Sequence, residues 1–281
     1  MISLENCKAI SLKKIQDSFS RVAGCYEKYA DLQNILGEEL LEQVLACERD
    51  YRHILDIGCG PGRLLKKLKV FFPESRLVGF DLSREMLRQV SCAKIHLLAG
   101  DAVSLPFKDS FFDLLLSGAT YQWVRDLPVA FREASRILRD GGDFIFSCFG
   151  SQTLSELRSC LGIENNPLPE AEFVEEVLKG AGFSDIELKV KRRKKHFDNL
   201  VALLSWLKYI GANQISHYQP LLTPARLTQA NNFYCSNYSS NGKVYPVRDT
   251  KQLTGSATVS NGVYASFEVI QVKAKKAVYG L

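Results

Sequence analysis

The fold of this chain is decided by the stretch Ile54-Leu55-Asp56-Ile57-Gly58-Cys59-Gly60-Pro61-Gly62. The apolar run His53–Ile57 has the character of a strand that is buried on both faces. The three glycines then allow a tight turn whose backbone N–H groups approach a ligand closely. Residues 63–68 follow with helical periodicity, so the turn lies at a helix N-terminus, where negative charge is favoured. The stretch predicts a site for a nucleotide-type cofactor.

Apolar runs alternate with stretches of helical spacing along most of the chain. This alternation predicts an α/β fold, with a Rossmann-like, seven-stranded, mostly parallel sheet and helices on both faces. The expected strands are His53–Ile57, Arg76–Phe80, Ile95–Ala99, Phe112–Ser117, Asp143–Phe149, Ile186–Phe197 and Tyr264–Val272. The expected helices include Asp31–Cys47, Glu85–Val90, Val129–Leu138, Glu170–Lys179 and Leu200–Ile210, with Gly141-Gly142 separating a helix from a strand. A polar region, Asn231–Gly242, precedes the last strand.

Composition narrows the class of protein. The chain has 281 residues, 46% of them apolar, and no apolar run near eighteen residues. The first residues mix charged and apolar side chains without a signal-peptide core, so we expect a soluble, cytoplasmic protein. Eight cysteines occur without a Cys-x-x-Cys pair, and the four histidines lie at no metal-ligand spacing. This pattern predicts reduced thiols and no metal site.

Three acidic residues follow the ends of successive predicted strands. Asp81 lies about 25 residues after Asp56, close to the interval of roughly 20 residues expected for an acid that binds ribose hydroxyls. Asp101, after the third strand, is suited to accept from an adenine amine, while Leu82 and Met86 offer the ring apolar faces. Asp56 is placed to orient the turn and attract a cationic methionine group. Three carboxylates favour a positively charged sulfonium cofactor over one that carries a pyrophosphate. The alternative is a Rossmann domain that binds another nucleotide.

The motifs Asp-x-Gly-x-Gly-x-Gly, Asp-Leu-Ser-x-x-Met-Leu and Gly-Asp-x-x-x-Leu-Pro-Phe resemble those of class I S-adenosylmethionine-dependent methyltransferases. The resemblance covers Asp56 to about Gly150 and implies S-adenosyl-L-methionine as cofactor, with S-adenosylhomocysteine as product. The expected cofactor-binding residues are Arg21, Asp56, Gly58, Cys59, Gly60, Gly62, Asp81, Leu82, Met86, Asp101, Ala102 and Ser117.

The flanking segments resemble a narrower family, the malonyl-acyl carrier protein O-methyltransferases (BioC family) of biotin synthesis. The similar segments are Phe19–Gln33, Tyr121–Trp123, Thr153–Leu157 and Leu207–Ala212. Gly118 stands where that family usually has Asn, and the segment from Val247 to Gly262 looks longer than the family's. We expect residues 1–50 to be a helical segment that closes over the cofactor. Residues 51–281 would be the methyltransferase domain, with a lid insertion at about 200–242.

The resemblance suggests Tyr26, Lys208 and Gln122 as catalytic residues. Tyr26 would orient the accepting oxygen, and Arg21 would pair with the methionine carboxylate of the cofactor; a solvated helix end is the alternative for both. The ammonium of Lys208, on an otherwise apolar helix, would either snorkel to solvent or reach a substrate anion. Gln122 precedes Trp123 at the ligand-binding edge of the sheet, where the tryptophan is equally suited to the core.

The net charge is only +5, but the basic residues cluster. The cluster comprises Lys189, Lys191, Arg192, Arg193, Lys194 and Lys195. A solvated strand end and a docking patch for an acidic partner such as acyl carrier protein are both compatible with it. Nucleic-acid binding would need interleaved aromatic residues and a wider basic surface, so it is disfavoured, and we expect no membrane association.

The resemblance implies methyl transfer to the free carboxyl of malonyl-acyl carrier protein. A carboxylate is already deprotonated at neutral pH, so the reaction needs alignment and water exclusion rather than a general base. Two alternatives stay open. One is a methyltransferase for another small acid or a quinone precursor; the other is a non-catalytic protein that binds S-adenosylmethionine or RNA through residues 189–195.

Overall fold

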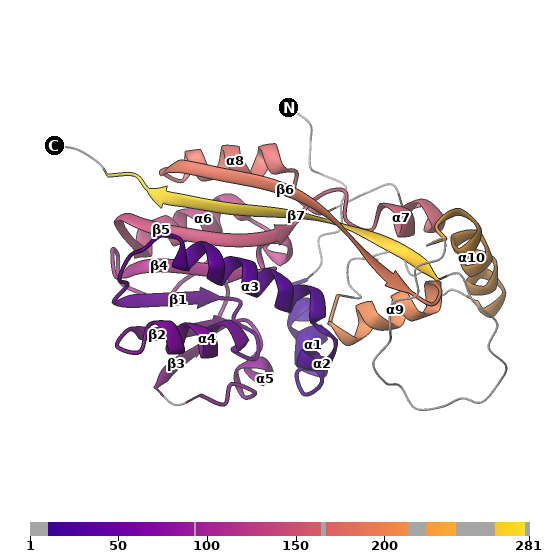
Figure 1. Cartoon of the computed structure of the whole chain (residues 1–281), viewed down its shortest axis with the longest axis horizontal. Helices are drawn as coiled ribbons and strands as arrows, with labels where there is room; N and C mark the ends of the chain where they lie inside the picture. Colours follow the sequence, from indigo (N-terminus) through magenta and orange to yellow (C-terminus); the bar gives the residue numbers. More distant parts are fainter. Residues whose placement is uncertain (1–10, 93, 164–166, 213–222, 240–261, 279–281) are drawn as a thin grey trace.

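One seven-stranded sheet runs through the described part of the molecule (Figure 1). The structure is a computed structural model, and it describes residues 11–92, 94–163, 167–212, 223–239 and 262–278. The strand order is β3-β2-β1-β4-β5-β7-β6; the pairs from β3 to β5 are parallel, and β7 is antiparallel to both β5 and β6. The predicted fold class is confirmed. The strands are β1 His53–Ile57, β2 Arg76–Asp81, β3 Ile95–Ala99, β4 Phe112–Gly118, β5 Leu138–Phe149, β6 Phe183–Phe197 and β7 Val263–Lys276.

Helices cover both faces of the sheet, because successive residues of its central strands point to opposite sides. Ile54 packs with helices α3 and α4 on one face, whereas its neighbour Leu55 packs with α6 and α8 on the other. Leu65 and Leu68, both fully buried, anchor α4, and Phe131 anchors α6. The helices are α3 Asp31–Leu45, α4 Arg63–Phe71, α5 Arg84–Leu87, α6 Leu127–Ile137 and α8 Ala171–Gly180.

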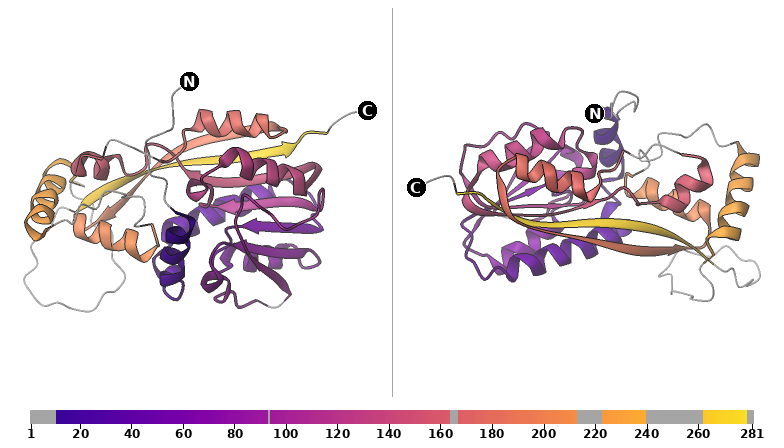
Figure 2. Two further views of the ribbon diagram at one scale, coloured as in Figure 1. Left: turned by 180° about the vertical axis from the view of Figure 1, so that it is seen from behind. Right: turned by 90° about the horizontal axis from the view of Figure 1, so that it is seen from above.

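Strands β6 and β7 continue past the sheet as a two-stranded ribbon, and three helices gather at its far end (Figures 1 and 2). They are α7 Ser155–Leu161, α9 Leu200–Tyr209 and α10 Pro224–Asn237. Helices α1 (Leu12–Val22) and α2 (Tyr26–Tyr29) lie between the sheet and α9 (Figure 2). The indole N–H of Trp206 donates to the Tyr29 carbonyl at 2.9 Å, and the ring of Tyr29 stacks on that of Tyr209 at 4.4 Å. The N-terminal helices are therefore fastened to the predicted insertion.

One local expectation is wrong. Gly141 and Gly142 lie inside β5, which begins directly after α6; the positive φ of Gly141 (69°) is accommodated where the β4–β5 register shifts. Part of the polar region, up to Asn237, is the C-terminal half of α10, because Thr223 caps this helix and Tyr234 is fully buried. Residues 213–222 and the tail at 247–261 lie outside the described residues, so the lid and the domain division stay predictions. Within the described ranges, no helix is both long and apolar enough to cross a bilayer.

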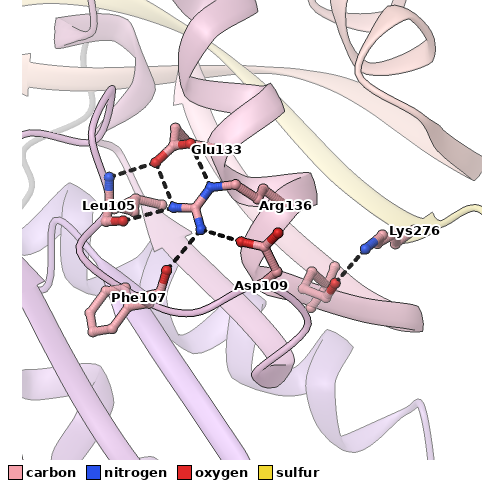
Figure 3. A network of polar contacts seen from close by, with 7 residues as sticks. Leu105, Phe107, Asp109, Glu133, Arg136 and Lys276 are labelled. Carbon is pink, nitrogen blue, oxygen red and sulfur yellow. Dashed lines mark hydrogen bonds and ion pairs between the residues drawn. The ribbon is translucent and has the colours of Figure 1, made fainter.

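Arg136 fixes the loop that carries the chain from β3 to β4 (Figure 3). Its guanidinium donates to the carbonyls of Leu105 and Phe107, both at 2.8 Å, and to the carboxylates of Asp109 and Glu133, both at 2.7 Å. Glu133 in turn accepts from the Leu105 N–H at 2.8 Å. Charge-assisted bonds of this kind hold a loop more firmly than neutral ones. The loop that follows Asp101 is thereby given one conformation.

Candidate functional site

The glycine-rich turn between β1 and α4 has the conformation that its sequence predicts. Gly58, Gly60 and Gly62 have φ values of 73°, 53° and 77°, in the left-handed region that glycine adopts without strain. The N–H groups of Gly58 and Cys59 both donate to the Phe80 carbonyl, at 2.6 and 3.1 Å. A Cβ on Gly58 would lie 2.0 Å from Thr120 Oγ1, whereas a Cβ on Gly60 would meet nothing within 4 Å. The turn is therefore pressed against the sheet at Gly58 and open at Gly60.

Asp81, at the end of β2, organises the turn. Its carboxylate accepts from the N–H of Gly60 and from the N–H of Ser83, each at 2.8 Å. Burial raises the pKa of this carboxyl, and the two N–H donors oppose the shift. Asp81 thus connects the end of β2 to Gly60, where the turn faces open space.

Asp56, the last acid of β1, is only 2% exposed. Burial and, second, the charge of Asp81 raise its pKa from 3.8 to about 7. A carboxyl in this state is readily ionised by a cation that binds beside it, because the cation stabilises the charged form. The pair of acids therefore makes this end of the sheet suited to a cationic ligand.

A cavity of about 600 Å³, including its mouth, lies between the turn and α3. Asp56, the turn and Gly118 form one wall. The opposite wall comes from α2 and α3, and includes Tyr26, Gln33, Asn34, Gly37 and Glu38. The volume of this cavity lies within the range found for small-molecule binding sites.

A second cavity of about 390 Å³ adjoins the first. Two residues, Tyr26 and Gln33, line both cavities, and the consecutive residues Gly118 and Ala119 line one each. The second cavity is mostly aromatic and aliphatic, and its lining is completed by Phe19, Gln122, Trp123, Phe149, Thr153, Trp206, Leu207, Ile210, Ala212 and Phe267. Two ligands bound in these cavities would meet at the shared residues.

Tyr26 is therefore the predicted catalytic residue that the structure places at the junction. Burial and, second, the negative charge of Asp81 raise the pKa of its phenol far above the ordinary range. The phenol stays protonated at any physiological pH and keeps its O–H as a donor.

Gln122 lines the second cavity, but its amide is already engaged. Nε2 donates to the Ala119 carbonyl at 2.6 Å, and Oε1 accepts from the Phe149 N–H at 3.4 Å. Gln122 thus joins the short helix Tyr121–Trp123 to the end of β5 and shapes the cavity wall. Trp123 lines the same wall, and its ring meets that of Phe19 edge to face at 5.5 Å.

Helix α1 covers two of the other predicted cofactor residues, Leu82 and Met86. Gln16 Nε2 donates to the Leu82 carbonyl at 2.9 Å, and Ser20 Oγ donates to Glu85 at 2.7 Å. Met86 packs against Val22 at the end of the helix. Asp101 caps its own loop by accepting from the Val103 N–H at 3.2 Å, and Ala102 is buried beside it. These residues cluster at the β2 and β3 ends without lining either cavity.

Three further predicted residues line neither cavity. Lys208 is exposed on α9, because Leu203, Trp206 and Leu207 bury the opposite side of that helix, so its ammonium does not line either cavity. Arg21 is exposed at the end of α1 and makes no ion pair with the described residues. Ser117 is fully buried within the sheet, where its hydroxyl donates to the Ile57 carbonyl at 2.8 Å. Its neighbour Gly118 lines the cavity instead.

The basic run on β6 is divided between two faces of the strand. Arg193 pairs with Glu39 of α3, Lys191 approaches the same carboxylate at 3.5 Å, and Lys195 pairs with Asp31. The alternate residues Arg192 and Lys194 point to the other face, since side chains alternate along a strand. The carboxylates of α3 therefore neutralise half of the basic cluster that the sequence predicted as a compact patch.

Several lining residues were not anticipated from the sequence. Gln33 and Gly37 lie one helical turn apart on α3, and a polar and a small residue at that spacing on a buried helix face are a usable signal. Phe149, Trp206 and Phe267 carry no such signal, because a hydrophobic pattern assigns them equally well to the core.

The comparisons with known proteins agree with this geometry. A family model described as "Methyltransferase domain" matches residues 55–146. A malonyl-acyl-carrier-protein O-methyltransferase of Hahella chejuensis is 35% identical over 222 residues, which cover 75% of this chain and 78% of that protein. The chain belongs to the malonyl-acyl-carrier-protein O-methyltransferase family. The chain is therefore a methyltransferase, and the two adjoining cavities are its candidate active site.

Two further similarities bear on this member of the O-methyltransferase family. The biotin biosynthesis bifunctional protein BioHC of Saccharophagus degradans is 35% identical over 233 residues, covering 76% of this chain and 41% of that protein. A solved structure of phosphoethanolamine N-methyltransferase 2 from Haemonchus contortus, in complex with S-adenosyl-L-methionine, aligns with a TM-score of 0.59 at 18% identity. That alignment covers 96% of this chain and 61% of the other, and it shows a shared fold.

Proposed function

We propose that this enzyme transfers the methyl group of S-adenosyl-L-methionine to the free carboxyl of malonyl-acyl carrier protein, in biotin synthesis. The observation that carries the proposal is the pair of adjoining cavities that meet at Tyr26 and Gln33. One cavity holds a buried acid beside a glycine turn, and the other is smaller and lined mostly by aromatic and aliphatic side chains. Family membership adds the identity of the acceptor. Complementation of a biotin auxotroph that lacks the methyl-ester step tests it: growth without biotin is expected, and no growth despite accumulation of folded protein would contradict it.

The first cavity suits the cofactor. Asp56 and the turn residues Gly58, Cys59, Gly60 and Gly62 would hold its methionine part, with Arg21 a candidate for the carboxylate end. The adenosine part would lie outside this cavity, at the ends of β2 and β3, where Asp81 would bind the ribose hydroxyls and Asp101 with Leu82, Met86 and Ala102 would bind the adenine. When bound, the cofactor supplies an electrophilic methyl group on a positively charged sulfur. The protein contributes alignment, and no general base is required for a carboxylate acceptor.

The second cavity suits the acceptor. Its aromatic walls exclude water from the carboxylate, which strengthens the attraction between that anion and the sulfonium. The sulfonium and the carboxylate neutralise each other as the methyl group moves, so a site of low polarity favours the transfer. Tyr26, with its O–H at the junction, is the proposed orienting group for the accepting oxygen.

Replacing Tyr26 by phenylalanine tests this role. We expect kcat for malonyl-acyl carrier protein to fall about tenfold, because one orienting hydrogen bond is lost. Cofactor affinity should change less than about twofold, since the ring remains in place. The matched control is Tyr209→Phe, which removes the hydroxyl of an exposed tyrosine on α9. Equal losses in both variants would contradict the orienting role.

The raised pKa of Asp56 predicts how cofactor binding depends on pH. The folded protein keeps this proton up to about pH 7, whereas the unfolded chain releases it near 3.8, so ligand-free stability should fall as pH rises between these values. A cationic cofactor prefers the ionised acid. Its Kd should therefore tighten by up to about tenfold per pH unit until about pH 7, then level off. Calorimetric titration of wild type and Asp56→Asn checks this; a pH dependence that persists in the variant would contradict it.

The outward face of β6 is the proposed docking surface for acyl carrier protein. Of the six basic residues first expected there, Lys191, Arg193 and Lys195 are tied to acids of α3, and Lys189 shares their face of the strand. Arg192 and Lys194 lie on the outward face, where Arg192 also approaches Glu268 at 3.9 Å, and they are the residues proposed to meet an acidic partner. The Arg192 side chain is 73% exposed, and the Lys194 ammonium lies 3.8 Å from the centre of the Tyr264 ring.

Reversing the charges of Arg192 and Lys194 to glutamate tests the surface. We expect KM for malonyl-acyl carrier protein to rise about tenfold at low salt, with a weaker salt dependence than in wild type. Turnover of malonyl-coenzyme A, which lacks the protein, should stay within about twofold. The control reverses Arg132 and Lys179, two exposed residues of α6 and α8. The same rise in KM in the control pair would overturn the assignment.

A further inference from the structure

Gln33 occupies an unusual position on α3. It is one of the two residues that line both cavities, and its side-chain carbonyl oxygen Oε1 is buried without a hydrogen-bond partner among the described residues. The helix holds it firmly, because the neighbouring Leu32 and Leu36 are 6% and 0% exposed. Buried carbonyl groups in native proteins are nearly always paired, since an unpaired one is costly. An oxygen left in this state at the edge of a cavity indicates a ligand group that approaches it.

The location of Gln33 identifies that group. A methyl group can pass from the first cavity to the second only if the sulfur that carries it lies where the two cavities meet. Tyr26, the other shared residue, offers a donor there, whereas Gln33 offers an acceptor. A carbonyl dipole with its oxygen toward a cation is favourable, and more so away from water.

We propose that Gln33 binds the sulfonium centre of the cofactor through Oε1 and so makes the site prefer S-adenosylmethionine to its demethylated product. A neutral amide is the fitting group for this task. A carboxylate at the same place would attract the sulfonium more strongly, but it would repel the anionic acceptor and compete with it for the methyl group. The preference also favours release of S-adenosylhomocysteine, which has lost the positive charge. This inference rests on the proposed cofactor but requires no particular acceptor.

The test is a calorimetric titration of the ligand-free protein with S-adenosylmethionine and with S-adenosylhomocysteine. These ligands differ by one methyl group and one positive charge. For Gln33→Met, which keeps the length of the side chain, we expect Kd for S-adenosylmethionine to rise about tenfold, as for the loss of one charge-assisted contact. Kd for S-adenosylhomocysteine should change less than about twofold. The thermal midpoint of the ligand-free variant should equal or exceed that of wild type, because the variant removes an unpaired buried oxygen.

Gln43→Met, the same substitution on the same helix but outside both cavities, is the matched control and should change neither affinity. If Gln33→Met does not fold, Gln33→Asn retracts the amide and should show the same selective loss. Equal weakening of both ligands, or a lowered midpoint with unchanged selectivity, would overturn the inference by assigning Gln33 a structural role. Failure of the proposed function is a separate result: S-adenosylmethionine would bind with the predicted selectivity while malonyl-acyl carrier protein stayed unmethylated.

Discussion

Replacing Asp81 by alanine is expected to weaken binding of S-adenosylmethionine by about a hundredfold or more, close to 3 kcal/mol. Two effects add. The proposed bond to the ribose hydroxyls disappears, and the N–H groups of Gly60 and Ser83 lose the carboxylate that accepts from both at 2.8 Å. The turn then loses its preferred conformation before the cofactor arrives. Titration calorimetry measures the loss, and circular dichroism checks that the fold persists.

Asp81→Asn separates the two effects. Asparagine keeps one acceptor oxygen for the turn but presents an N–H₂ group in place of the other. We expect the affinity of Asp81→Asn for S-adenosylmethionine to lie between those of wild type and Asp81→Ala. Asp109→Ala, on an exposed residue near Arg136, serves as the control. If Asp81→Ala bound the cofactor within about twofold of wild type, the proposed role of Asp81 in cofactor binding would be contradicted.

Replacing Gly58 by alanine is expected to destabilise the protein by about 2–5 kcal/mol and to abolish measurable cofactor binding. An alanine at a φ of 73° costs about 1–2 kcal/mol, and overpacking a tight site adds about 1–3 kcal/mol. The new Cβ would lie 2.0 Å from Thr120 Oγ1, so Thr120 or the turn has to move. Urea unfolding measures the loss of stability.

Gly60→Ala is the matched comparison, because Gly60 also has a positive φ (53°) but its Cβ would meet open space. Its loss of stability should be limited to about 1–2 kcal/mol. The double variant Gly58→Ala/Thr120→Gly should recover part of the loss, since the clashing side chain is gone. Equal losses for Gly58→Ala and Gly60→Ala would show that the contact with Thr120 does not matter.

The central part of the fold could be predicted because its signals are local. His53–Ile57 and Ile95–Ala99 have the bounds that their apolar runs indicate, and the positive φ values of Gly58, Gly60 and Gly62 follow from the glycines themselves. Other boundaries depend on contacts that are distant in sequence. Helix α10 exists because Tyr234 is buried in the core at the ribbon's far end, although the surrounding residues are polar.

The acidic residues of the candidate site could be predicted from the sequence, whereas the residues around the proposed acceptor were harder to predict. Asp56 and Asp81 lie near the ends of the neighbouring strands β1 and β2, so strand order brings them together. The resemblance suggests Lys208 as a catalytic residue, and its apolar helix leaves two directions open for the ammonium, which only the packing of Leu203, Trp206 and Leu207 resolves. Gln33 gave only the signal of its spacing from Gly37, because its importance comes from two cavities formed by segments far apart in the chain. The ion pairs between β6 and α3 were hidden for the same reason.

The measurement that tests the central claim most directly is mass spectrometry of acyl carrier protein after incubation with the purified enzyme and S-adenosylmethionine. The account predicts that malonyl-acyl carrier protein gains the mass of one methyl group, on its free carboxyl. Acetyl-acyl carrier protein, which has no such carboxyl, should stay unchanged. An enzyme that binds S-adenosylmethionine yet leaves malonyl-acyl carrier protein unmethylated, or methylates both proteins equally, would contradict it.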